Sequence, residues 1–144
     1  MDRTDVDGLV VGSGPAGSTT ARYAAMGGAS VMFIERRPEV GVPVRCGEFM
    51  PSIEEIKGMF PNYVDEDSLF DIPQELRCLE THGIKLVDPK GKITLLDHEG
   101  YTTDRDRFDQ YLAKLAVEEG AVLERNCLFK GIENGVAKTS QGDV

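Results

Sequence analysis

Residues 6–17, VDGLVVGSGPAG, decide how the chain folds, because an apolar segment runs directly into a turn rich in glycine. Gly12 permits a tight turn at the end of a strand, and Gly14 lets the backbone approach a ligand closely. Gly17 allows the helix that follows to pack closely against the strands. We therefore expect an α/β fold in which the first strand is buried in a parallel sheet.

A second apolar strand is predicted at residues 31–34, after a helix over residues 16–26, and it ends on Glu35. In sheets of this kind, free N–H groups at the helix start bind phosphate, and the acid after the second strand accepts hydrogen bonds from ribose. A glycine-rich turn by itself is weak evidence, because a flexible loop has the same composition. Here strand, turn, helix, strand and acid follow in order, so the sequence predicts a binding site for an adenine dinucleotide.

The composition is that of a globular protein, and it disfavours several other classes. The 144 residues carry a net charge of −9, whereas a nucleic-acid surface needs clustered Lys and Arg. We expect neither a membrane-spanning helix nor an export signal. The three cysteines, Cys46, Cys78 and Cys127, are widely spaced and suggest neither a metal pair nor a disulfide framework. We therefore expect no metal and a reducing, cytoplasmic compartment.

The remaining chain alternates predicted loops, helices and strands. Residues 36–51 are expected to form an extended loop, and Ser52 with Glu55 predicts a helix start of the capping-box type. The acidic residues 65–67 fit a solvated turn or a helix start. An amphipathic helix is predicted over residues 105–119. Strands are predicted at residues 84–88, 92–97, 101–103 and 121–124, followed by a hairpin at residues 127–139 with an Asn-Gly turn.

Three segments together resemble the geranylgeranyl reductase family: residues 12–17 with Glu35-Arg36-Arg37, PVRCGE at 43–48, and DRDRFD at 104–109. The Arg-Cys-Gly-Glu part is the most specific, since other proteins with the glycine-rich turn do not need it. The family belongs to the flavoprotein superfamily that includes para-hydroxybenzoate hydroxylase. Its members bind FAD and reduce isolated double bonds of prenyl chains. The resemblance covers only the first part of a typical member.

The resemblance implies an FAD site built from several of these segments. The residues that it assigns to cofactor binding are Gly12, Gly14, Pro15, Ala16, Gly17, Glu35, Arg36, Arg45, Cys46 and Arg105. Within this set the turn would hold the pyrophosphate, Glu35 the adenosine ribose, and Arg105 the ribityl or phosphate portion. The alternative for Arg105 is a solvated charge at a helix start. Arg36 and Arg37 keep NADP open, because they would attract a 2′-phosphate that Glu35 would repel.

Cys46 is also a candidate proton donor. Saturating an isolated double bond needs a hydride at one carbon and a proton at the other, and a thiol with an ordinary pKa of about 8.5 can supply that proton near neutral pH. The alternative is that Cys46 is a small buried residue without a chemical role. His82 and His98 stand alone in predicted loops, so we expect them to be exposed and assign them no role.

The predicted fold class is a Rossmann-like FAD/NAD(P)-binding domain with a parallel sheet, plus short antiparallel strands of an incomplete substrate domain and a β-hairpin. Residues 1–50 and 104–144 would form the first part of the FAD-binding domain, and residues 51–103 an inserted segment on the substrate side. Family members continue to a second flavin-contacting motif of the Gly-Asp-Gly type. We therefore interpret the chain as an N-terminal fragment that is inactive alone, with its first strand left at a sheet edge that invites self-association.

The predicted function is the reduction of double bonds in geranylgeranyl chains by an FAD-dependent oxidoreductase. The substrate would be a prenyl lipid, with electrons supplied by NAD(P)H or ferredoxin, and a lipid substrate implies a peripheral contact with the membrane. No nucleic-acid partner is expected. Two alternatives stay open: a flavin-dependent monooxygenase or halogenase of the same superfamily, and a non-catalytic dinucleotide-binding module.

Overall fold

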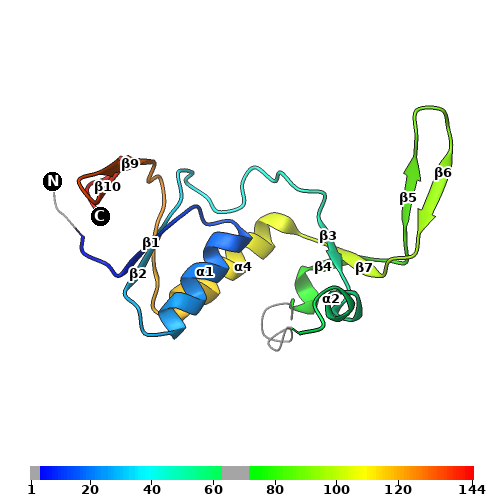
Figure 1. Ribbon diagram of the computed structural model, residues 1–144, viewed down its shortest axis with the longest axis horizontal. Coiled ribbons are helices and arrows are strands. Elements are labelled where there is room, and N and C mark those ends of the chain that lie inside the picture. Colours follow the sequence, from blue (N-terminus) through cyan, green and yellow to red (C-terminus); the bar gives the residue numbers. More distant parts are fainter. Residues whose placement is uncertain (1–3, 63–71) are drawn as a thin grey trace. The chain divides into compact units, whose positions relative to one another are not determined.

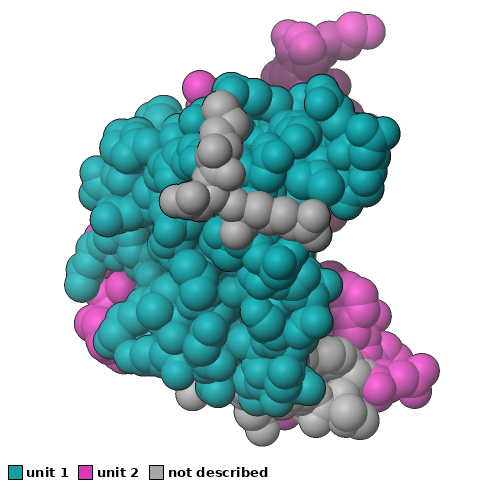
Figure 2. Space-filling view, turned by 90° about the vertical axis from the view of Figure 1, so that its left-hand side faces the viewer, with its two compact units in different colours: residues 1–44, 106–144 teal, residues 45–105 magenta. Residues whose placement is uncertain are grey.

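The computed structural model describes residues 4–62 and 72–144, which form two compact units (Figures 1 and 2). Unit 1 consists of residues 1–44 and 106–144, and unit 2 of residues 45–105. The boundary expected after residue 50 falls inside a strand of unit 2, and the roles expected of the two parts stay predictions. The acidic segment 65–67 lies outside the described residues.

Unit 1 is built on a parallel sheet, as the sequence predicts. The strands β1 (Gly8–Val11), β2 (Val31–Ile34) and β8 (Val122–Glu124) lie in the order β1-β2-β8. Among the described strands, β1 pairs with β2 alone, so it stands at an edge rather than at the centre. Val11 at its end is 55% exposed. Self-association through this edge stays a prediction.

The two faces of the central strand are covered by different elements. Helices α1 (Pro15–Met26) and α4 (Arg105–Glu118) contribute small side chains to a core that includes Val31 and Phe33. The opposite face, with Met32 and Ile34, packs on Cys127 and Phe129. Because side chains alternate along a strand, all four residues of β2 are buried between these layers.

The chain of unit 1 ends in the predicted hairpin. Strands β9 (Phe129–Glu133) and β10 (Val136–Thr139) pair antiparallel. Asn134 and Gly135 join them with φ values of 52° and 79°. Two successive positive φ angles are what a two-residue turn between twisted strands requires, and Asn-Gly is the preferred pair there.

Unit 2 contains an antiparallel sheet of order β3-β7-β4 and a separate two-stranded hairpin, β5-β6. Within it, the hydroxyl of Ser52 accepts the N–H of Glu55 at 3.2 Å, which confirms the predicted helix start. The expected loop over residues 36–51 ends in β3, because this segment pairs with β7 far along the chain. The elements are β3 (Phe49–Pro51), α2 (Ile53–Met59), η1 (Gln74–Leu76), β4 (Arg77–Thr81), β5 (Ile84–Val87), β6 (Ile93–Leu96) and β7 (Gly100–Thr103).

None of the helices in the described part of the chain has both the length and the apolar character that crossing a bilayer would require.

Candidate nucleotide-binding site

The start of α1 is open to a ligand. Gly14 is the N-cap residue, and among the described residues no side chain caps this helix start. The first helical hydrogen bond runs from the N–H of Ser18 to the carbonyl of Gly14 at 2.9 Å, so the N–H groups of Ala16 and Gly17 precede it. A Cβ added at Gly14 would meet no described atom within 4 Å. The turn therefore presents N–H groups and the positive end of the helix dipole to an open space, as phosphate binding needs.

Two positions of the turn require glycine, each for a different structural reason. Gly12 has a φ of 101°, which a residue with a side chain rarely adopts. At Gly17 the φ is ordinary, but a Cβ would overlap the backbone carbonyl of Gly12. Gly17 thus lets the helix approach the end of β1, which is the role that the sequence predicts for it.

The carboxylate of Glu35 lies against this turn. Its Oε2 accepts the backbone N–H of Ser13 at 3.3 Å and the Ser13 hydroxyl at 3.1 Å. Its Oε1 accepts the N–H of Arg37 at 3.0 Å. A carboxylate has about four acceptor positions, so about one position, on Oε1, stays available to a ligand. Ser13 is itself fully buried, and its carbonyl accepts the hydroxyl of Ser18 at 2.9 Å. This hydrogen bond ties the turn to α1.

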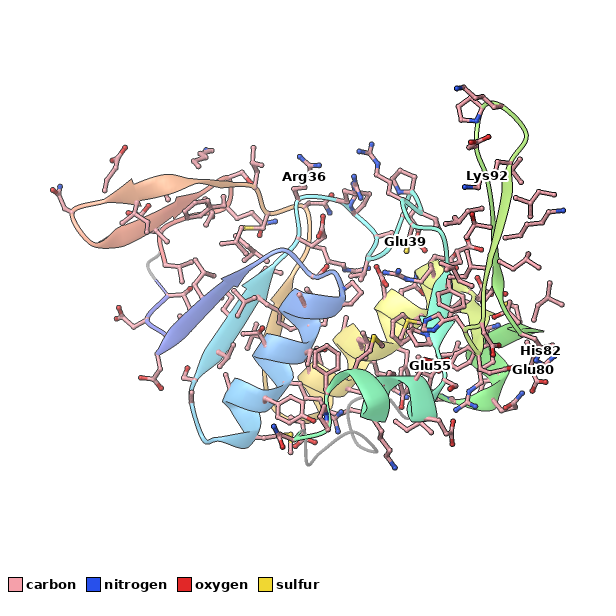
Figure 3. All side chains as sticks on the ribbon, turned by 45° about the vertical axis from the view of Figure 1, so that its right-hand side comes forward. Arg36, Glu39, Glu55, Glu80, His82 and Lys92 are labelled. Carbon is pink, nitrogen blue, oxygen red and sulfur yellow. The ribbon has the colours of Figure 1, made fainter. Side chains whose placement is uncertain are left out.

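A cavity of about 290 Å³ opens beside the turn, at the carboxyl ends of β1 and β2. Glu35 and Arg36 line it together with residues 127–129, and Figure 3 shows Arg36 on the loop that leaves β2. The N–H of Cys127 donates to the carbonyl of Glu35 at 2.8 Å, which holds that segment in place. Our sequence reasoning did not assign residues 127–129 to the site. Their position directly after a parallel strand could have indicated it, since the carboxyl ends of parallel strands share one edge.

Three further predicted site residues lie in unit 2. The structure brings Cys46 and Arg105 together, because Arg105 Nη1 donates to Cys46 Sγ at 2.6 Å. The N–H of Glu48 donates to the same sulfur at 3.4 Å. Cys46 is exposed, so the alternative of a small buried residue is wrong. Arg45 is exposed as well.

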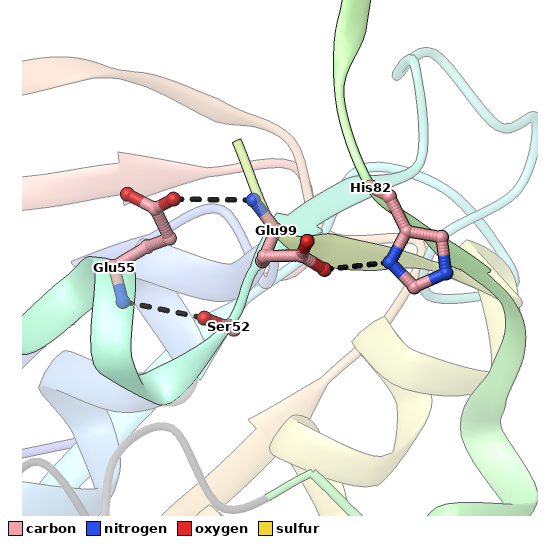
Figure 4. Close-up of polar contacts among 4 residues, drawn as sticks. All are labelled: Ser52, Glu55, His82 and Glu99. Carbon is pink, nitrogen blue, oxygen red and sulfur yellow. Dashed lines mark hydrogen bonds and ion pairs between the residues drawn. The ribbon is translucent and has the colours of Figure 1, made fainter. Parts of the chain in front are cut away.

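A second polar cluster in unit 2 was not expected from the sequence. His82 Nδ1 lies 2.8 Å from Glu99 Oε2 (Figure 4). His98 Nδ1 lies 3.1 Å from Glu55 Oε2. The N–H of Glu99 donates to Glu55 Oε1 at 3.1 Å. Ser52 belongs to the same cluster, because its hydroxyl accepts the N–H of Glu55. The expectation that both histidines are exposed is wrong for His98, whose side chain is 23% exposed. The hydrogen bond to Glu99 raises the pKa of His82 above its ordinary value of 6.5.

The polar cluster borders a cavity of about 510 Å³ in unit 2. Residues from α2, β4 and β7 line this cavity, among them Arg77, whose guanidinium lies 4.8 Å from the ring centroid of Tyr101. Within residues 4–62 and 72–144, no three His, Cys, Asp or Glu side chains are arranged to hold a metal ion.

Comparison with known proteins extends these observations. Residues 10–60 match the family described as NAD(P)-binding Rossmann-like domain. A digeranylgeranylglycerophospholipid reductase of Thermoplasma acidophilum is 38% identical over 128 residues, which are 84% of this chain and 29% of the reductase. A protein from the nifH2 5′ region of Methanosarcina barkeri is 34% identical over 134 residues, 93% of this chain and 72% of that protein. The crystal structure of a geranylgeranyl bacteriochlorophyll reductase-like protein from Thermoplasma acidophilum matches 93% of this chain and 34% of its own, with a TM-score of 0.73 and 36% identity.

The chain belongs to the geranylgeranyl reductase family. This confirms the resemblance, the α/β fold class with its Rossmann-like dinucleotide-binding domain, and the flavoprotein superfamily expected from the sequence. The chain spans between 28% and 33% of the length of the digeranylgeranylglycerophospholipid reductases that it matches.

Flavin-dependent halogenases share the fold of this family member. A brominase named Bmp2 matches 98% of the chain with a TM-score of 0.65 at 21% identity, and a halogenase named PltM does so with a TM-score of 0.66 at 15% identity. At this level of identity the likeness concerns the fold alone.

Proposed function

We propose that this chain supplies the nucleotide-binding part of an FAD-dependent oxidoreductase that reduces double bonds of geranylgeranyl chains in membrane lipid precursors. The observation that carries the proposal is the position of Glu35, which Ser13 holds against the glycine-rich turn beside the open start of α1. The similarity to reductases at 33% to 38% identity supports the substrate class.

The residues present fit the adenosine diphosphate half of FAD. The first turn of α1 has no acidic residue to repel a pyrophosphate, and Gly14 leaves room above it. Glu35 keeps about one acceptor position for a ribose hydroxyl. The adjacent cavity of about 290 Å³ offers a place for the adenine. Glu35 also favours FAD over NADP, because its charge would repel a 2′-phosphate, although the exposed Arg36 would attract one.

Each predicted site residue keeps its proposed task. The turn, with Gly12, Gly14, Pro15, Ala16 and Gly17, would bind the pyrophosphate, and Glu35 and Arg36 would border the adenosine. Arg45, Cys46 and Arg105 would serve the flavin and the prenyl substrate. The contact between Cys46 and Arg105 supports a shared task for these two residues.

Bound FAD would supply the hydride for one carbon of the double bond, with its electrons taken from NAD(P)H or ferredoxin. The chain would supply the proton for the other carbon, and we assign this step to the thiol of Cys46. The guanidinium of Arg105 and the N–H of Glu48 both donate to Sγ, so they orient the sulfur. The exposure of Cys46 leaves it accessible to a substrate.

A chimaera tests this function. The chain replaces the matched 128 residues of the Thermoplasma acidophilum reductase, and the product is supplied with FAD, dithionite and a digeranylgeranyl lipid in detergent without oxygen. We expect mass spectrometry to show saturation of the prenyl chains, with the unmodified reductase as positive control. A chimaera that retains FAD but saturates no double bond would contradict the assignment and favour a non-catalytic nucleotide-binding module.

A halogenase or monooxygenase of the same superfamily is the second candidate, and the brominase and PltM show that its fold is compatible with this chain. Such an enzyme consumes oxygen, whereas prenyl reduction proceeds without it. Oxygen-dependent modification of an aromatic substrate by the chimaera, with no anaerobic reduction of prenyl chains, would support this candidate. The Arg-Cys-Gly-Glu segment, which includes Cys46, argues for the reductase.

A further inference from the structure

One wall of the nucleotide cavity is formed by residues 127–129, which follow β8. The chain enters this wall at Asn126, whose φ is 54°. That left-handed conformation is uncommon for a residue with a side chain, and asparagine tolerates it better than most. The N–H of Asn126 donates to the carbonyl of Arg37 at 3.1 Å, and the next N–H, that of Cys127, donates to the carbonyl of Glu35 at 2.8 Å. The wall is thus tied to the segment that carries the proposed ribose ligand.

The same segment is also held by Ser140, which directly follows β10 at the red end of the chain in Figure 1. Ser140 Oγ accepts the N–H of Leu128 at 2.9 Å and donates to the carbonyl of Asn126 at 3.3 Å. The backbone N–H of Ser140 donates to the carbonyl of Leu128 at 2.9 Å. Gln141 adds a bond from Nε2 to the carbonyl of Arg125 at 2.8 Å. One serine therefore satisfies both backbone groups of Leu128, a residue that lines the cavity.

The hydroxyl of Ser140 is what distinguishes it from other residues at this position. Any residue except proline could donate its backbone N–H to Leu128, whereas the two side-chain bonds require a group that both donates and accepts. The strands β9 and β10 pair through their own backbones, so the hairpin does not need this hydroxyl. The identity of Ser140 therefore bears on the position of Leu128 more than on the stability of the hairpin.

We propose that Ser140 is a positioning residue for the adenosine half of the bound nucleotide, and that it acts by fixing Leu128 in the cavity wall. The inference rests on the proposed nucleotide site, to which it adds a residue beyond the wall itself. Leu128 supplies apolar surface on which the face of the base packs, next to the ribose contact of Glu35. A wall that is fixed in advance binds more tightly, because ordering it during binding would cost free energy. The pyrophosphate lies at the start of α1, so its contacts do not depend on Ser140.

Isothermal titration calorimetry on the full chain tests the proposal by comparing ADP with inorganic pyrophosphate, which lacks the adenosine. Ser140→Ala should weaken ADP binding about threefold to tenfold, the range of a lost hydrogen bond, and leave pyrophosphate binding unchanged. Ser140→Thr keeps the hydroxyl and should keep the wild-type ratio of the two affinities. Asp143→Asn is the matched control, because it breaks the 2.6 Å ion pair with Lys138 near the same chain end. It should leave that ratio unchanged as well.

A double-mutant cycle tests whether Ser140 acts through Leu128. Leu128→Ala should weaken ADP binding about tenfold through lost apolar contact, again without an effect on pyrophosphate. In this background Ser140→Ala should cause little further loss, because the side chain that it positions is gone. Amide hydrogen exchange of the Leu128 N–H, followed by NMR without any ligand, should be faster in Ser140→Ala than in the wild-type chain. Urea unfolding of each variant verifies the fold.

Several results would overturn the proposal. They are unchanged ADP binding in Ser140→Ala, equal losses for ADP and pyrophosphate, and independent effects of the two substitutions in the cycle. Should Ser140→Ala yield no folded protein, unchanged ADP binding in Leu128→Ala would overturn the proposal instead. A wild-type chain that binds ADP no more tightly than pyrophosphate would also do so, since the cavity would then hold no adenosine. Only a wild-type chain that binds neither ligand would contradict the proposed nucleotide site itself, so the two failures are distinguishable.

Discussion

Glu35 accepts two hydrogen bonds from Ser13, one from its backbone N–H at 3.3 Å and one from its hydroxyl at 3.1 Å. The two residues are 22 positions apart, yet the parallel pairing of β1 with β2 places the ends of both strands together. Ser13 therefore aims the carboxylate at the glycine-rich turn before any ligand arrives. This arrangement makes Ser13 a positioning residue for the proposed ribose contact.

Ser13→Ala should weaken ADP binding about threefold to tenfold, because the variant removes a hydrogen bond to a charged group but keeps the backbone N–H. Isothermal titration calorimetry on the chain measures the effect. The loss should shrink with 2′-deoxy-ADP and disappear in a Glu35→Gln background. An equal loss for ADP and 2′-deoxy-ADP would show that Ser13 acts on the turn and not through the ribose contact.

Gly14 and Gly17 should respond differently to the same substitution. Gly17→Ala places a methyl group against the Gly12 carbonyl. We therefore expect the free energy of unfolding, measured in urea, to fall by about 1–3 kcal/mol, or the variant to yield no folded protein. Gly14→Ala meets no described atom, so the fold should keep its stability while ADP binding falls. A stable Gly17→Ala variant would contradict the close packing of α1 on β1.

The pair His82–Glu99 should make a pH-dependent contribution to stability. The raised pKa of His82 means that the folded chain binds a proton more tightly than the unfolded chain does. The contribution is therefore fully present below the ordinary value of 6.5, and it is lost as the pH rises through the raised pKa of the folded state. An NMR titration of the His82 ring should show this pKa falling toward 6.5 in Glu99→Gln, with His98 as internal comparison.

Cys46→Ser should slow prenyl reduction by the chimaera about 100-fold, the lower range for general acid catalysis. Reduction of its flavin by dithionite should keep the wild-type rate, since the thiol is proposed to act on the substrate. Cys78→Ser is the matched control, because Cys78 is another exposed cysteine of unit 2. An unchanged rate of double-bond saturation in Cys46→Ser would remove Cys46 from the proton transfer.

The chain by itself should bind FAD weakly. It spans 29% of the Thermoplasma acidophilum reductase, and the sequence contains no second flavin-contacting motif of the Gly-Asp-Gly type. Absorbance of the purified chain near 450 nm should therefore reveal far less than one bound flavin per chain. A yellow, stoichiometric complex after gel filtration would show that unit 1 and unit 2 suffice for the cofactor.

The local sequence predicted the elements that depend on neighbouring residues. The turn at Gly12 and Gly17, the helix start at Ser52 and the Asn134-Gly135 hairpin are confirmed, because φ preferences and capping act within a few residues. The edge position of β1 in the described sheet agrees with the sheet edge predicted for the first strand. The predicted ends of the segments were less accurate. For example, β3 forms by pairing with β7, which lies about fifty residues further along the chain.

The sequence by itself thus determined the nucleotide-binding element, since its turn, helix and second strand are consecutive and each step is constrained by local geometry. Only the tertiary structure decided what surrounds that element. The bond between Cys46 and Arg105 joins residues 59 positions apart, and residues 127–129 reach the cavity through a bond to Glu35. The contact of Ser140 with Leu128 is likewise a property of the packed chain. Such contacts depend on strand order and register, which are set by burial over the whole unit and leave no local pattern.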